Sequence, residues 1–136
     1  MTAMTAQAVL VVEDDPTLAR TITHNLSARG YIARNATTVV EALAALDDER
    51  PAALLLDIDL PDGSGWDIVR TLRGDGGADV PVIVMSALQP NQRLCHDFHA
   101  AGVLEKPFPM ESLLRLVAQA TGRRAAPDPA DIMSAD

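Results

Sequence analysis

Residues 54–63 read LLLDIDLPDG, an apolar run that ends abruptly in acidic residues. Three leucines in a row are typical of a buried strand, whereas an ionised carboxylate is costly to bury without a partner. Asp57 and Asp59 therefore stand where a strand leaves the core, and the Pro-Asp-Gly that follows indicates a turn. The carboxylate of Asp57 needs partners from elsewhere in the chain, and the ends of the other expected strands supply candidates.

The composition is that of one acidic domain with an aliphatic core. The chain has 136 residues, of which 48% are apolar and only 3% aromatic, so leucine, valine, isoleucine and alanine must fill the core. A formal net charge of -8 argues against nonspecific binding to nucleic acid or to an anionic membrane. We therefore expect no direct nucleic-acid partner and no membrane partner.

The expected compartment is the cytoplasm. No segment approaches the ~20 consecutive apolar residues of a membrane-spanning helix. The N-terminus, MTAMTAQ, lacks the basic start and apolar stretch of a secretory signal. The single cysteine, Cys95, rules out an internal disulfide and fits a reducing compartment.

Strands and helices are expected to alternate five times along the chain. The expected strands cover residues 8–12, 31–35, 53–57, 80–85 and 102–105. The expected helices run from Pro16 to Gly30, from Thr38 to Leu46, from Trp66 to Gly74, over about 91–101, and from Pro109 to about residue 121. The strands are apolar without alternation, which favours a parallel sheet covered by helices on both faces. We expect one domain over residues 7–121 and a flexible tail or linker over 122–136.

Polar side chains follow four of these strands at the point where each strand ends. They are Glu13 and Asp14, then Asp57, Ser86 and Lys106. Because ligands of open parallel sheets bind at the carboxyl ends of the strands, we expect these groups to share one crevice. Crowded carboxylates repel one another, and a hard cation with oxygen ligands, such as Mg²⁺, relieves that repulsion. A lysine and a hydroxyl beside the metal can hold a phosphoryl group, so the pattern indicates Mg²⁺-assisted phosphoryl transfer to a carboxylate.

Each of these residues taken alone has an ordinary explanation. Asp14 or Asp15 most often caps a helix that begins at Pro16. Ser86 alone is a loop serine, and Lys106 alone is a surface lysine. Only the joint pattern, with one group after each strand, is specific.

The stretches that carry this pattern resemble the receiver domain of two-component response regulators over about residues 8–120. They are VVEDDP (11–16), LLLDIDLPDGSGWDIVRTLR (54–73), VIVMSA (82–87) and EKPF (105–108). The resemblance implies an α/β, flavodoxin-like, doubly wound sheet of five parallel strands in the order 2-1-3-4-5, with five helices. It also implies a phosphorelay switch rather than an enzyme. A histidine kinase or a histidine phosphotransfer protein would supply the phosphoryl group, and a downstream protein target would respond.

The resemblance implies a metal ligand set. Glu13, Asp14 and Asp57 would bind Mg²⁺ through their carboxylates, and the backbone carbonyl of Asp59 would be a further ligand.

The resemblance also implies a phosphoryl site. Asp57 would accept the phosphoryl group, while Ser86 and the small residue Ala87 would contact it and Lys106 would pair with it. Pro107 would follow a cis peptide bond.

Two departures from the family pattern concern output rather than chemistry. Val103 stands where the family usually has tyrosine or phenylalanine, so Phe98 or Phe108 is a candidate to report the switch instead. The segment from Ser86 to Lys106 is slightly shorter than is usual in the family. The fourth helix is therefore expected to have an unusual form and an unusual partner surface.

Two alternative functions stay open at this stage. One is a receiver-like binding module that is never phosphorylated, against which the full set of site residues argues. The other is a phosphatase of the haloacid dehalogenase type, in which Asp57 would be the nucleophile and Asp59 a general acid. Against this second alternative, its first motif usually lies near the chain start, and VVEDD would be unexplained.

Two further patterns are weaker. Cys95 and His99 in CHDFH have the i, i+4 spacing of a helical metal site, but zinc requires four ligands and no second cluster exists. We favour the interpretation in which Leu94 and Phe98 bury one face of a helix. The fourth and last helices also leave room for a homodimer face.

Overall fold

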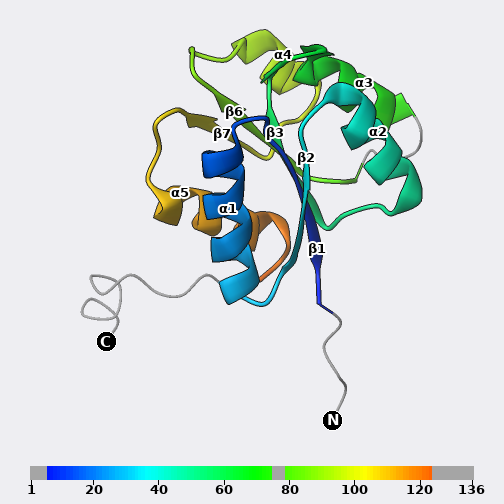
Figure 1. Ribbon diagram of the computed structural model, residues 1–136. Coiled ribbons are helices and arrows are strands. Elements are labelled where there is room, and N and C mark those ends of the chain that lie inside the picture. The colour runs from blue at the N-terminus through cyan, green and yellow to red at the C-terminus, as the bar shows by residue number, and fades with distance from the viewer. Residues whose placement is uncertain (1–5, 75–78, 124–136) are drawn as a thin grey trace.

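Five parallel strands form the central sheet in the order β2-β1-β3-β6-β7 (Figure 1). The computed structural model describes residues 6–74 and 79–123. The strands of the sheet are β1 (Ala8–Val12), β2 (Ile32–Ala36), β3 (Ala53–Asp57), β6 (Val82–Ser86) and β7 (Gly102–Glu105). Counting these five alone, the order is 2-1-3-4-5, which confirms the expected flavodoxin-like doubly wound sheet.

Helices cover both faces of the sheet (Figure 1). They are α1 (Pro16–Ala28), α2 (Val39–Asp48), α3 (Gly65–Gly74), α4 (Gln92–Asp97) and α5 (Met110–Ala120). Alternate residues of β1 show the two layers, because Val9 and Val11 pack with α1 and α5, while Leu10 and Val12 pack with α2 and α3. The leucines of β3 are fully buried because this strand lies at the centre of the sheet.

The fourth helix is shorter than the expected 91–101, so that prediction was wrong in length. It spans only Gln92–Asp97 because His99 adopts a left-handed backbone with φ of 54°. The N–H of Ala100 then donates to the carbonyl of Cys95 (2.9 Å), and the N–H of His99 donates to that of His96 (3.2 Å). These two bonds form a Schellman ending, which glycine usually provides. A histidine here offers no sequence signal for a helix end.

A short antiparallel hairpin follows β3, and the sequence did not predict it. Its strands are β4 (Asp59–Leu60) and β5 (Gly63–Ser64). At its turn, the carboxylate of Asp62 accepts hydrogen bonds from the N–H groups of Val39 (2.7 Å) and Val40 (3.2 Å). The hydrogen bond from Val39 is the main cause that lowers the pKa of Asp62. The turn residue therefore also caps the start of α2.

Arg123, which follows α5, contacts residues that precede β1 and β2, at the N-terminal ends of these strands. The guanidinium carbon of Arg123 lies 3.8 Å from the ring centroid of Tyr31, and its Nε donates to Oε1 of Gln7 at 2.6 Å.

The boundary between a domain over 7–121 and a tail over 122–136 stays a prediction, and from residue 124 onward that tail lies outside the described residues. Within 6–74 and 79–123, no helix has the length and apolarity that crossing a membrane requires.

Candidate functional site

The carboxyl edge of the sheet brings the expected site residues together. Glu13 directly follows β1, Asp57 ends β3, Ser86 ends β6 and Lys106 directly follows β7. Glu13, Asp57 and Ser86 are the buried polar residues of the described chain, with 1%, 4% and 5% of their surface exposed. An edge of a parallel sheet that concentrates buried polar groups is a ligand site in this class of fold.

Lys106 joins two of the acids. Its ammonium nitrogen donates to Oε1 of Glu13 at 2.6 Å and to Oδ2 of Asp57 at 3.0 Å. Burial acts to lower the pKa of Lys106, but the hydrogen bonds to the two carboxylates outweigh it, so the pKa is raised. Burial is also the main cause that raises the pKa of Glu13, and the hydrogen bonds from Lys106 and from the Asp15 N–H only partly offset it. Lys106 therefore keeps its positive charge beside the two buried carboxylates.

Three carboxylates form a cluster that suits a hard cation. Glu13, Asp14 and Asp57 each offer an oxygen, and these oxygens all lie within 4.8 Å of one another. Oxygen-only donors with a net negative charge are the ligands that Mg²⁺ prefers in proteins. The residues present therefore fit the expected magnesium site.

The two neighbouring aspartates of the first loop have different tasks. Asp15 is the N-cap of α1, and its carboxylate accepts from the N–H groups of Thr17 (3.0 Å) and Leu18 (3.4 Å). Asp14 takes no part in this cap and belongs to the acidic cluster. The helix-capping explanation is therefore correct for Asp15, whereas the carboxylate of Asp14 lies with those of Glu13 and Asp57.

Asp59 contributes to the site through its backbone. Its N–H donates to Oδ1 of Asp57 at 2.9 Å, while its own side chain is exposed. Asp57 is thus held by Lys106 on one oxygen and by this N–H on the other. The role of the Asp59 carbonyl as a metal ligand stays a prediction.

Ser86 links the site to the loop that leads into α4. Its Oγ accepts a hydrogen bond from the N–H of Leu88 at 3.3 Å, and its carbonyl accepts one from the N–H of Lys106 at 2.7 Å. Ala87 follows on the exposed part of the loop. Ser86 lies on the strand beside Asp57, and the bond between Lys106 and Pro107 is cis, as the family resemblance implied.

Gly65 belongs to the site, and the sequence reading gave it no role. A Cβ atom at this position would lie 2.6 Å from the carbonyl oxygen of Asp57 and 3.0 Å from Cα of Ile58. Only glycine therefore allows α3 to begin against the loop that carries Asp57. The signal was present as the second glycine of DGSG, two residues after the glycine of the hairpin.

The structure places Val103 and the residues of the CHDFH segment. Val103 is 44% exposed on the edge strand β7. Leu94, Cys95 and Phe98 are partly buried against the core, as the interpretation without a metal predicted. Over the part of the chain that the structure describes, Glu13, Asp14 and Asp57 form the only group of three or more potential metal ligands.

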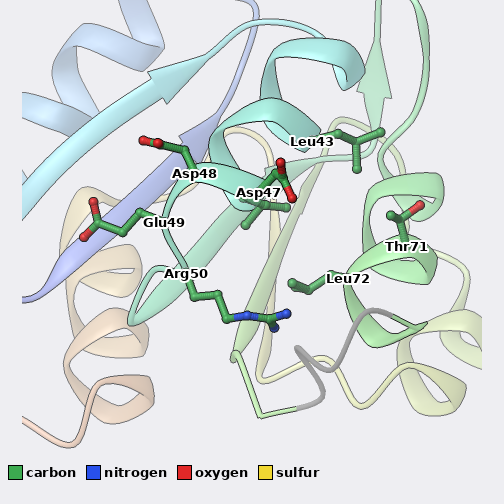
Figure 2. A pocket seen from close by; sticks show the side chains of 8 residues that line it. Leu43, Asp47, Asp48, Glu49, Arg50, Thr71 and Leu72 are labelled. Atoms are coloured by element: carbon green, nitrogen blue, oxygen red, sulfur yellow. The ribbon is translucent and has the colours of Figure 1, made fainter.

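Among the hollows that the described residues line, one lies between α2 and α3 and another adjoins the site. The first pocket has a volume of about 440 Å³, and its lining includes none of Glu13, Asp14 and Asp57. Figure 2 shows its lining side chains, which come from α2, from α3 and from the segment between α2 and β3. Its lining consists of Leu43, Leu46, Asp47, Asp48, Glu49, Arg50, Thr71 and Leu72. A second, open groove of about 490 Å³ runs between α1 and the loop after β7, and Lys106 forms part of its wall. Its other lining residues are Asp15, Thr17, Leu18, Thr21, Pro107, Phe108 and Met110.

Comparison with protein families and with curated proteins agrees with this geometry. A family model described as the response regulator receiver domain matches residues 9–118. The response regulator MprA of Mycobacterium tuberculosis is 37% identical over 124 residues, covering 90% of this chain and 53% of that protein. The transcriptional regulatory protein KdpE of the same species is 37% identical over 120 residues, covering 87% and 52%. The chain thus spans about half the length of the curated relatives it matches.

Solved structures show the same fold. A CheY-like receiver domain protein from Methanospirillum hungatei superposes with a TM-score of 0.82 at 22% identity, covering 87% of this chain and 95% of that one. The receiver domain of a sensor histidine kinase from Pseudomonas aeruginosa superposes with a TM-score of 0.76 at 29% identity, covering 87% and 99%. That second structure holds a magnesium ion coordinated in its active site cleft.

Proposed function

Because this chain belongs to the response regulator receiver domain family, we propose that Asp57 accepts a phosphoryl group from a phosphohistidine. The donor would be a histidine kinase or a histidine phosphotransfer protein. The observation that carries the proposal is the position of the buried Asp57 carboxylate, which lies beside those of Glu13 and Asp14 and accepts a hydrogen bond from Lys106. A carboxylate held by hydrogen bonds on both of its oxygens is oriented for attack.

The proposed transfer is a single displacement at phosphorus. A carboxylate oxygen of Asp57 attacks, and an acyl phosphate forms as the phosphorus–nitrogen bond breaks. The electron pair of that bond stays on the donor imidazole, which takes up a proton from solvent. Lys106 neutralises charge on the phosphoryl oxygens, and Ser86 donates a hydrogen bond to one of them. Positioning and electrostatics therefore do most of the work, as in phosphoryl transfer generally.

The proposed cofactor is Mg²⁺. Glu13, Asp14 and Asp57 would hold it, together with the backbone carbonyl of Asp59. When bound, the ion would neutralise negative charge on the phosphoryl oxygens. The close spacing of the three carboxylates and the raised pKa of the buried Glu13 support a site that gains from a cation.

The proposed partners are proteins. The open groove that Lys106 lines, and the hydrogen bond from Lys106 to Asp57, support an approach of the phosphoryl donor from this side. A downstream protein target would read the phosphorylated state, and we expect no direct contact of this domain with nucleic acid or membrane. Cytoplasmic location and a homodimer through α4 and α5 stay predictions.

A small phosphoryl donor tests the proposal without the unknown kinase. Phosphoramidate carries a phosphorus–nitrogen bond like that of phosphohistidine, so it should add one phosphoryl group to the protein when Mg²⁺ is present. Intact mass spectrometry measures the addition, and EDTA should suppress it. A chain that stays unmodified at high donor concentration would favour the receiver-like binding module.

The phosphatase alternative has its own test. A generic phosphate ester should not be turned over by this protein, and Asp59→Asn should leave phosphorylation intact because only the backbone of Asp59 contacts Asp57. Turnover that Asp59→Asn abolishes would instead support the phosphatase.

A further inference from the structure

Phe98 fastens the end of α4 to α3. Its ring stacks on Trp66, with centroids 5.9 Å apart and an angle of 22° between the ring planes. The guanidinium carbon of Arg70 lies 5.9 Å from the centroid of the same ring. Nε and Nη2 of Arg73 donate to the carbonyl of Phe98 at 3.3 and 3.1 Å. Successive turns of α3 thus converge on one residue, and we call these four residues the Phe98 clamp.

Apart from the clamp, helix α4 contacts the core through Leu94 and Cys95, which are only partly buried. It is six residues long and none of its residues is fully buried. The side chains of Arg93 and His96 are each 89% exposed. A helix this short has little stability of its own, so its position depends on what is fastened to its ends.

Both ends of α4 lead back to the phosphoryl acceptor. The beginning is connected through the loop in which the N–H of Leu88 donates to Oγ of Ser86. The end is connected through Phe98 to Trp66, and Trp66 follows Gly65, whose backbone lies against the carbonyl of Asp57. These two links form one contiguous path of packed and hydrogen-bonded groups around the site.

We propose that the Phe98 clamp is a lock that phosphorylation of Asp57 opens. Once Ser86 turns its hydroxyl toward the phosphoryl group, the N–H of Leu88 loses its acceptor and the loop before α4 shifts. The short helix follows this loop, and Phe98 leaves Trp66. This inference rests on the proposed function, because it requires a phosphoryl group on Asp57. It makes α4 a two-state element whose closed state is held by named contacts.

The only tryptophan of the chain reports the lock directly. In the full chain, Mg²⁺ with beryllofluoride, a phosphoryl mimic, should red-shift the emission of Trp66 as its stacking partner leaves. Hydrogen exchange at the Phe98 and Ala100 amides should become about tenfold faster, since the clamp combines an aromatic pair with a cation–π contact.

Matched variants separate the clamp from other routes. Phe98→Leu should show the red-shifted emission and fast exchange without beryllofluoride, and adding it should change little. Phe98→Tyr keeps a ring and should behave like the parent. Val103→Ala, on the exposed edge of the sheet, should also keep the full response. Arg70→Gln, at an exposed position, gives the same test with an intermediate shift if Phe98→Leu folds poorly.

The phosphoryl content of the same samples distinguishes the two proposals. Treatment with acetyl phosphate, followed by intact mass, shows whether the parent is modified at all. An unmodified parent would overturn both the proposed function and the lock. A modified parent whose Trp66 emission and α4 exchange do not change would overturn the lock alone. A response lost in Val103→Ala but kept in Phe98→Leu would overturn it as well.

Discussion

The ammonium nitrogen of Lys106 lies 3.0 Å from Oδ2 of Asp57, although β6 lies between the strands that carry them. The same nitrogen donates to Glu13, which follows the strand on the other side of Asp57. One cation therefore ties together the ends of three strands. A cation that binds these carboxylates must compete with Lys106 for the same oxygens, so binding of the cation and rearrangement of Lys106 are linked.

Mg²⁺ should raise the melting temperature of the protein because the folded acidic cluster binds it and the unfolded chain does not. At a hundredfold excess over its Kd, a ligand of this kind stabilises by about 2.7 kcal/mol. Asp14→Ala should remove most of this increment in thermal unfolding, because it deletes one oxygen of the cluster. The matched control is Asp15→Ala, which should cost about 1 kcal/mol as a lost cap but keep the Mg²⁺ increment. A full increment in Asp14→Ala would contradict the ligand set.

Gly65→Ala should destabilise the protein and slow phosphorylation, because the added methyl group would meet the carbonyl of Asp57. Overpacking of this kind costs about 1–3 kcal/mol, which urea unfolding can measure. Gly74→Ala is the control, since nothing lies within 4 Å of its added Cβ, and it should be neutral or slightly stabilising. Equal effects of the two substitutions would show that the contact with Asp57 is unimportant.

His99→Gly should stabilise the protein, because glycine adopts the left-handed backbone at the end of α4 without strain. The gain should be up to about 1 kcal/mol after the entropy of the unfolded glycine is subtracted. Gly30 occupies the equivalent position after α1 with φ of 86°, so Gly30→Ala should show the opposite sign. A loss of stability in His99→Gly would mean that the imidazole has contacts that outweigh the strain.

Asp62→Ala should lower the melting temperature at neutral pH, because it removes the acceptor of the Val39 and Val40 N–H groups at the start of α2 and leaves only the N-cap Thr38. The pKa of Asp62 is lowered in the folded protein, chiefly by the hydrogen bond from the Val39 N–H. Its contribution is therefore fully present above the ordinary pKa of 3.8 and is lost as pH falls through the lower folded value. The difference between parent and variant should accordingly shrink in acid. A difference that stays the same size in acid would contradict this capping role of the Asp62 carboxylate.

Much of the fold was predictable because its signals are local. The apolar runs placed β1, β3 and β7 at their observed bounds, and β2 and β6 within two residues of theirs. Gly30 ends its helix as expected, since glycine at a helix end has a known backbone reason. The end of α4 was missed because His99 takes the same backbone shape without the glycine that signals it.

The site was predictable in its residue types but not in its contacts. The strand ends indicated that Glu13, Asp57 and Lys106 would meet, and the structure brings them into direct hydrogen bonding. The role of Gly65 and the stacking of Phe98 on Trp66 depend on tertiary approach, which no local pattern encodes. The hairpin after β3 has strands of two residues each, too short for any periodic signal.

Phosphorylation of three proteins, the parent, Asp57→Asn and Asp59→Asn, tests the central claim most directly. Each is incubated with acetyl phosphate and Mg²⁺ and measured by intact mass spectrometry. The account predicts that the parent and Asp59→Asn each gain the mass of one phosphoryl group, while Asp57→Asn gains none. A phosphoryl group on Asp57→Asn, or a parent that gains none, would contradict it.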